Sequence, residues 1–293
     1  MKYSLFLSAA LLSSTILPAY ANQPVVSTSE QHVLGSPEQA VLAPMHYLMF
    51  GDVKSAFEYS MPSEYRQVME NKWDEERRRP TSERQKERFL ATMEFSSGEG
   101  AEERIFAQVQ PMLLEYRTNV APTLAMQVGM GRGMLLGMIQ QDPKLTPEQK
   151  ESTSVVFNAF FDWVIEHGEQ FGDEQLAKKA VNRFVRMVRE MNLHSLDEVN
   201  ALTFNQLLEK GSVAWAAGMD ISALYGMDFQ TLFKSVSVDV VSREGNTAKL
   251  NVSYNFLNKP MTVPVNVVEQ NGAWYEQDTL RELGKEFGIG KMQ

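Results

Sequence analysis

The chain of 293 residues contains no cysteine. This excludes disulfide bonds and thiolate metal ligands, so the fold has to be stabilised by burial of apolar side chains. Histidine is scarce as well, with four residues that lie far apart in the sequence and form no His-Glu-x-x-His motif. We therefore predict no metal site and no cofactor.

Basic residues are outnumbered by acidic ones. The chain has 28 Lys and Arg against 37 Asp and Glu, a formal net charge of −9. Nucleic-acid binding depends on neutralising phosphates with Lys and Arg, and attraction to an anionic membrane surface also needs basic side chains. The composition disfavours both classes of partner.

Long apolar runs are missing except near the start of the chain. Residues 5–17 are apolar but too few to span a bilayer, which takes about 20 residues. Lys2 precedes this run, and Ala19-Tyr20-Ala21 follows it with the spacing that signal peptidase cleaves. We predict a signal peptide over residues 1–21, cleavage after Ala21 and a soluble periplasmic protein, with no stable membrane insertion.

Recognisable catalytic motifs are absent too. The sequence has no Gly-x-Ser-x-Gly, no Ser-x-x-Lys of the hydrolase type and no phosphate-binding glycine loop. The glycine-rich residues 129–133 lack the third spacing of a dinucleotide fingerprint and follow a helical segment rather than a strand. These absences favour a non-enzymatic role.

What the chain does contain is a long helical region, expected over residues 36–230 after a flexible leader at 22–35. Ser36-Pro37 and Thr146-Pro147 each place a capping residue directly before a proline, a typical helix start. Between such starts, apolar residues recur three and four positions apart.

Breaks in this helical region are predicted at Pro111, Pro122 and Gly211, among other positions. The mixed-charge run at residues 74–79 has three acids followed by three arginines. We interpret it as a solvated helix face, with an anion-binding patch as the alternative.

From Phe233 onward the apolar period changes from 3.6 to 2, which predicts strands. Three turn signals separate four strands, and the strongest is Asn271-Gly272, because both central residues of a type I′ turn need positive φ. One sheet face is apolar, and a short helix is expected at 279–287. The polar face carries Lys249, Asn251, Ser253 and Asn255, and the other two turns are expected at 244–246 and 258–260.

These patterns predict an α+β protein, with a mainly helical N-terminal two thirds and a C-terminal four-stranded antiparallel meander over residues 231–293. Residues 36–69 and 233–278 resemble the opening helices and the curved sheet of bacterial secreted domains of the nuclear-transport-factor-like, or cystatin-like cone, family. The resemblance implies that residues 36–79 and the sheet form one domain with a large helical insertion. The alternative is a separate helical domain before a small α+β domain.

In cone folds the sheet and the helices enclose a pocket. A pocket here would have polar groups from His46, Asp239, Tyr254 and Glu276 and apolar walls from Phe256 and Trp274. Asp239 alternates with the valines of the first strand, and Asp278 is the residue expected to cap the last helix. The alternative role for the acids is in solvation and helix capping.

Residues 126–138 carry the most unusual pattern. Met126, Met130, Met134 and Met138 recur every four residues beside a parallel stripe of Gly129, Gly133 and Gly137. The pattern fits a tightly packed core helix, an exposed surface for a partner, or thioether ligation of Cu(I). Because a glycine stripe allows a second backbone to approach closely, we expect this face to be closed to solvent and predict no copper binding.

Together these observations predict a non-enzymatic binding or interaction protein of the cell envelope, with an envelope protein as partner and the methionine residues as contact surface. The alternative is a small-molecule pocket, ligand-binding or enzymatic, between the sheet and the N-terminal helices.

Overall fold

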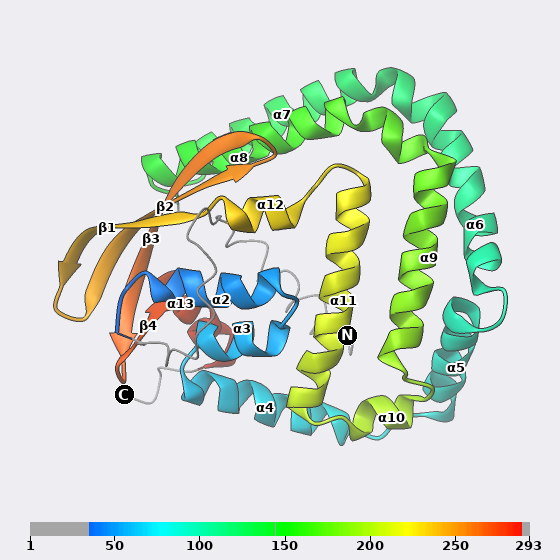
Figure 1. The fold of residues 1–293 in the computed structure, drawn as a ribbon, viewed down its shortest axis with the longest axis horizontal. Helices are drawn as coiled ribbons and strands as arrows, with labels where there is room; N and C mark the ends of the chain where they lie inside the picture. The colour runs from blue at the N-terminus through cyan, green and yellow to red at the C-terminus, as the bar shows by residue number, and fades with distance from the viewer. Residues whose placement is uncertain (1–34, 144, 289–293) are drawn as a thin grey trace.

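The computed structural model describes residues 35–143 and 145–288, so the predicted signal peptide and all but the last residue of the leader lie outside the described residues. Figure 1 shows a sheet at one side of the molecule, with helices running from it in a wide arc and returning inside that arc. The α-helices are α2 (Gln39–Met49), α3 (Val53–Ser60), α4 (Ser63–Arg77), α5 (Glu83–Ser97), α6 (Ala101–Glu115), α7 (Leu124–Gln141), α8 (Pro147–Glu166), α9 (Glu174–Met191), α10 (Leu196–Ala201), α11 (Phe204–Leu224), α12 (Phe229–Lys234) and α13 (Gln277–Phe287).

The C-terminal sheet is a meander, with strand order β1-β2-β3-β4 and antiparallel pairing throughout. This confirms the α+β class with a helical N-terminal part. The strands are β1 (Ser237–Glu244), β2 (Thr247–Phe256), β3 (Lys259–Gln270) and β4 (Ala273–Glu276).

Two of the turns test the sequence prediction in detail. Asn271 and Gly272 have φ of 54° and 82°, as a type I′ turn requires, which confirms that turn. The β2–β3 turn lies at Leu257 and Asn258, with φ of 50° and 63°, one residue before the expected position. Pro260 therefore lies inside β3. It is tolerated there because β4 pairs only with residues 267–270, so among the described residues no strand pairs with this edge at Pro260.

The two faces of the sheet differ as predicted. Alternate residues of β2 are buried, and their neighbours are exposed or half-buried. The buried face packs against α2 through Val41 and Met45, against α12 through Phe233, and against α8 through Ala159. The sheet and these three helices thus share one hydrophobic core. The buried β2 residues are Ala248, Leu250, Val252, Tyr254 and Phe256.

The helical arc is more continuous than predicted. Pro111 lies inside α6 and Gly211 inside α11, so the breaks expected at these two residues are wrong. Tertiary packing explains the continuity, because α6 contacts α5 and α9, and α11 contacts α9 and α3. Such packing outweighs a local cost of about 3 kcal/mol for proline or about 1 kcal/mol for glycine. At Pro122 the α-helix does change, through a π-helix (Tyr116–Val120) and a short 3-10 turn (Ala121–Thr123) before α7.

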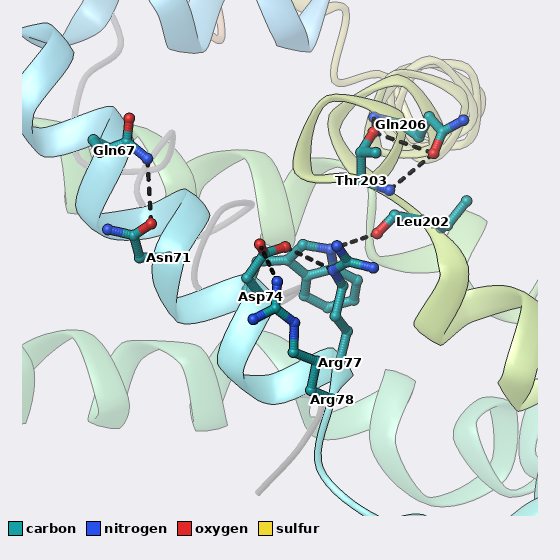
Figure 2. Close-up of polar contacts among 9 residues, drawn as sticks. Gln67, Asn71, Asp74, Arg77, Arg78, Leu202, Thr203 and Gln206 are labelled. Carbon is teal, nitrogen blue, oxygen red and sulfur yellow. Dashed lines mark hydrogen bonds and ion pairs between the residues drawn. The ribbon is translucent and has the colours of Figure 1, made fainter.

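The charged run at residues 74–79 ends α4 and is internally neutralised. Figure 2 shows Asp74 between the guanidinium groups of Arg77 and Arg78, at 2.6 and 3.1 Å. Arg79 pairs with Glu76 at 2.5 Å. With every arginine of the run ion-paired, the solvated-face interpretation is favoured over an anion-binding patch.

One buried tryptophan fastens α4 to the end of α10. The indole nitrogen of Trp73 donates to the carbonyl oxygen of Leu202 at 2.8 Å (Figure 2). The next residue, Thr203, starts α11 through a capping box with Gln206. The chain is thus held where it turns back into the inner helix of the arc (Figure 1).

Candidate interaction surface

The outer side of α7 carries a row of exposed methionines. Met126, Met130, Met134 and Met138 are 61%, 67%, 72% and 59% exposed. Four residues rotate about 400° around the helix axis, so each methionine is displaced by only about 40° from the one before. The four side chains therefore stay on one side of the helix over about 18 Å of its length. We call these four residues, with Gly129, Gly133 and Gly137 beside them, the methionine face. The less exposed residues of α7 are Leu124, Val128, Arg132, Leu135, Leu136, Gly137 and Ile139, and all of them except Gly137 lie on its other side.

This exposure contradicts the packed-core alternative for the methionines. Methionines that do fill the core are nearly inaccessible, with Met45 2% and Met261 5% exposed. The reason lies in the position of α7, which runs along the outside of the arc and packs along α8, while α8 in turn contacts β3 (Figure 1).

The expected close approach to the glycines is also wrong for the described part of the chain. A Cβ atom added at Gly129, Gly133 or Gly137 would meet nothing within 4 Å. The glycines therefore form an open groove beside the methionine ridge. The reason given for predicting no copper binding, a closed face, does not hold, and the prediction itself stays untested.

The methionine face carries no charge. Arg132 is the one charged residue in the sequence of α7, and its guanidinium lies 2.6 Å from Asp162 of α8 and 5.5 Å from the ring of Phe161. The other carboxylate oxygen of Asp162 lies 3.8 Å from the amine of Lys259 in β3. These contacts hold α7 on α8 and leave the outer side of α7 uncharged. The sequence offered a signal for this, because the position of Arg132 in the helical repeat places it opposite the methionines.

Three of the six pocket candidates, the polar Tyr254 and the apolar Phe256 and Trp274, lie in the packed core. Tyr254, Phe256 and Trp274 are 6%, 8% and 3% exposed, and all belong to the core cluster under the sheet. Burial raises the pKa of the Tyr254 hydroxyl to about 12. Their role in the structure is packing.

The other three polar candidates lie in other surroundings. Asp239 is exposed on β1, and His46 is exposed on α2, where its ring contacts Phe50 edge-on at 4.9 Å. Glu276 accepts hydrogen bonds from the backbone nitrogens of Asp278 and Thr279 at 3.0 and 2.5 Å. The six candidates are thus divided among the core, the exposed surface and a helix start, an arrangement that does not favour the pocket hypothesis.

Glu276, rather than Asp278, is the N-cap of α13, and the helix begins two residues earlier than predicted. Asp278 lies in the first turn instead and pairs with Arg281 at 2.8 Å. Asp278 therefore does not lie on the strand with Trp274, because β4 ends at Glu276.

Replacing Glu276 by alanine is expected to lower the free energy of unfolding by about 1 kcal/mol, the usual cost of losing a side-chain N-cap. Urea unfolding followed by circular dichroism measures this loss. Glu276→Gln, whose amide oxygen can still accept, should lose less than Glu276→Ala. Equal stability of the alanine variant and the native chain would contradict the capping role.

Within the described residues, no group of three or more His, Asp or Glu side chains is placed to hold a metal ion. No helix among these residues has the length and apolarity needed to cross a bilayer. Comparison with protein-family models, curated proteins and solved structures gives no match to this chain.

Proposed function

We propose that this protein is a non-enzymatic interaction protein of the periplasm, and that its methionine face binds an apolar helix of an envelope protein. The observation that carries the proposal is the row of four methionines, each 59–72% exposed, on an uncharged helix side. Contiguous apolar patches are uncommon on the surface of soluble proteins and often mark interaction sites. The periplasmic location rests on the predicted signal peptide.

The shape of the face suits a helical partner. Side chains four residues apart form a ridge on a helix, and two helices pack by placing such a ridge in the groove of the other. Here the methionines form the ridge, and Gly129, Gly133 and Gly137 form a groove that no part of the described chain fills. Because methionine is flexible and polarisable, the ridge can adapt to the partner's side chains.

The energetics of α7 support a role outside the chain's own fold. With Gly131, the helix has four glycines in 18 residues, and within the described residues no atom lies within 4 Å of a Cβ added at any of them. Each costs about 1 kcal/mol of helix stability relative to alanine. No close contact at these glycines in the described chain makes use of the missing side chains, whereas close contact with a partner helix would.

A protein partner fits the face better than a lipid surface. Helices that lie in a membrane interface are typically rich in Lys and Arg beside their apolar side. The only basic residue of α7, Arg132, pairs with Asp162 instead.

The experiment is capture of partners from an envelope extract by the tagged mature protein, quantified by mass spectrometry. A double variant, Met130→Glu with Met134→Glu, is expected to reduce specific capture at least about tenfold, because two carboxylates would lose water on binding without gaining a counter-charge. Since both side chains are mostly exposed, the fold should change in stability by no more than about 1 kcal/mol in total.

The matched control adds the same two charges elsewhere. Gln175 and Asn182 are exposed on α9, with Lys178, Lys179 and Arg186 nearby along the helix. Gln175→Glu with Asn182→Glu should capture partners as the native protein does. Equal capture by the methionine variant, or no specific partner for the native protein, would contradict the proposal.

A further inference from the structure

The methionines of this chain fall into groups of very different accessibility. The four of the methionine face are 59–72% exposed, and Met112 on α6 is 66% exposed. Met45, Met61 and Met261 are at most 5% exposed. The other methionines within the described residues are half-buried.

Chemistry follows this division. The chain has no cysteine, so its methionine thioethers are the only sulfur atoms that an oxidant can attack. Oxidation of methionine to the sulfoxide depends on exposure and is reversed by methionine sulfoxide reductases. A Cβ added at the neighbouring Gly129, Gly133 or Gly137 would meet nothing within 4 Å, so no other part of the described chain lies against these glycines.

We propose that the methionine face is a site of reversible oxidation by hydrogen peroxide. The sulfur lone pair attacks one peroxide oxygen, the O–O bond breaks, and a sulfoxide and one water form. Sulfur loses two electrons and the peroxide gains them. Thiol-dependent reductases return the thioether, with the oxygen leaving as water.

The modification changes the surface and leaves the fold intact. A sulfoxide is polar where the thioether is apolar. Four sulfoxides in a row would turn the uncharged apolar ridge into a polar one, while the other side of α7, with Leu135 and Ile139, keeps its contacts. Oxidation is then expected to release the partner helix, a consequence that rests on the proposed function.

The first test measures oxidation alone. The mature protein is treated with limiting hydrogen peroxide, and each methionine peptide is followed by mass spectrometry. Met126, Met130, Met134 and Met138 should oxidise about tenfold or more faster than Met45, Met61 and Met261. Met112 serves as an exposed reference outside the face and should oxidise at a rate similar to theirs. Methionine sulfoxide reductases A and B with dithiothreitol should then restore the four thioethers.

Two results would overturn the site. One is oxidation of the buried and exposed methionines at the same rate. The other is protection of the four while Met112 reacts, which would mean that the face is covered in solution. Neither result depends on whether a partner exists, so failure of the proposed function is distinguishable from failure of the oxidation site.

The second test asks whether oxidation controls binding. Capture from the envelope extract should fall after peroxide treatment of the native protein and recover after reductase treatment. A variant with leucine at positions 126, 130, 134 and 138 stays apolar but cannot form sulfoxides there, so its capture should not respond to peroxide. Undiminished capture by the oxidised native protein would overturn this control of binding.

Discussion

Replacing Trp274 by alanine is expected to lower the free energy of unfolding by about 4 kcal/mol, the range found for large aromatic residues removed from a core. The side chain is 3% exposed on β4 and belongs to the same buried cluster as Leu250 and Phe233, which are fully buried. The guanidinium of Arg243 lies 4.9 Å from its ring centre. The loss combines burial of a large apolar surface with the cavity left behind.

Urea unfolding followed by far-ultraviolet circular dichroism measures this effect without relying on tryptophan fluorescence, to which the chain's four tryptophans contribute. Phe50→Ala is the control, because Phe50 is 69% exposed and its loss should cost less than about 0.5 kcal/mol. The core role would be contradicted if Trp274→Ala lowered the free energy of unfolding by a comparably small amount. If the native protein also bound a small molecule, these results would support Trp274 as a pocket wall.

The sheet was the most predictable part of the fold, because its signals are local. Alternation of apolar and polar residues places Leu250 and Val252 on one face and Lys249 and Asn251 on the other, whatever packs against them. The Asn271-Gly272 turn depends on two residues that tolerate positive φ. The β2–β3 turn lies one residue before its predicted position because strand pairing places Leu257 in the turn with positive φ. Local preference would place Asn or Gly at such a position.

The helical part was less predictable in its details. Local rules assign a break to Pro111 and to Gly211, but the surrounding helices hold both segments helical. Long-range packing of this kind cannot be predicted from a sequence segment of a few residues. In both cases a break was predicted where the helix continues, because tertiary contacts compensate the lower helix propensity of proline and glycine.

The candidate site shows the same limit. The repeat of Met126 to Met138 fixes which residues share a helix side but not whether another element covers that side. Whether this side is covered depends on the position that α6 and α8 give to α7, and a local sequence pattern does not predict that position. For Glu276, the error came from the position of the strand end, since β4 ends at this residue and its carboxylate caps α13.

Replacing Gly129, Gly133 and Gly137 together by alanine is expected to raise the free energy of unfolding by about 2–3 kcal/mol. All three lie within α7 without positive φ, and an added Cβ meets no atom of the described residues within 4 Å, so each alanine gains its full helix preference. The same three methyl groups would fill the groove beside the methionine ridge. The variant should therefore be more stable and yet capture its partner more weakly, because a partner helix could no longer approach closely.

The control for this variant is Gly218→Ala in α11, an exposed glycine whose added Cβ also meets nothing within 4 Å in the described part of the chain. It should gain about 1 kcal/mol with no change in capture. Urea unfolding and quantitative capture from the envelope extract, run on the same preparations, separate the two effects. A triple variant that is stabilised and captures the partner fully would restrict the contact to the methionine ridge and contradict ridge-into-groove packing. A triple variant that is destabilised would show that the glycines have a close neighbour within the protein itself. This result would contradict the open groove on which the proposed function depends.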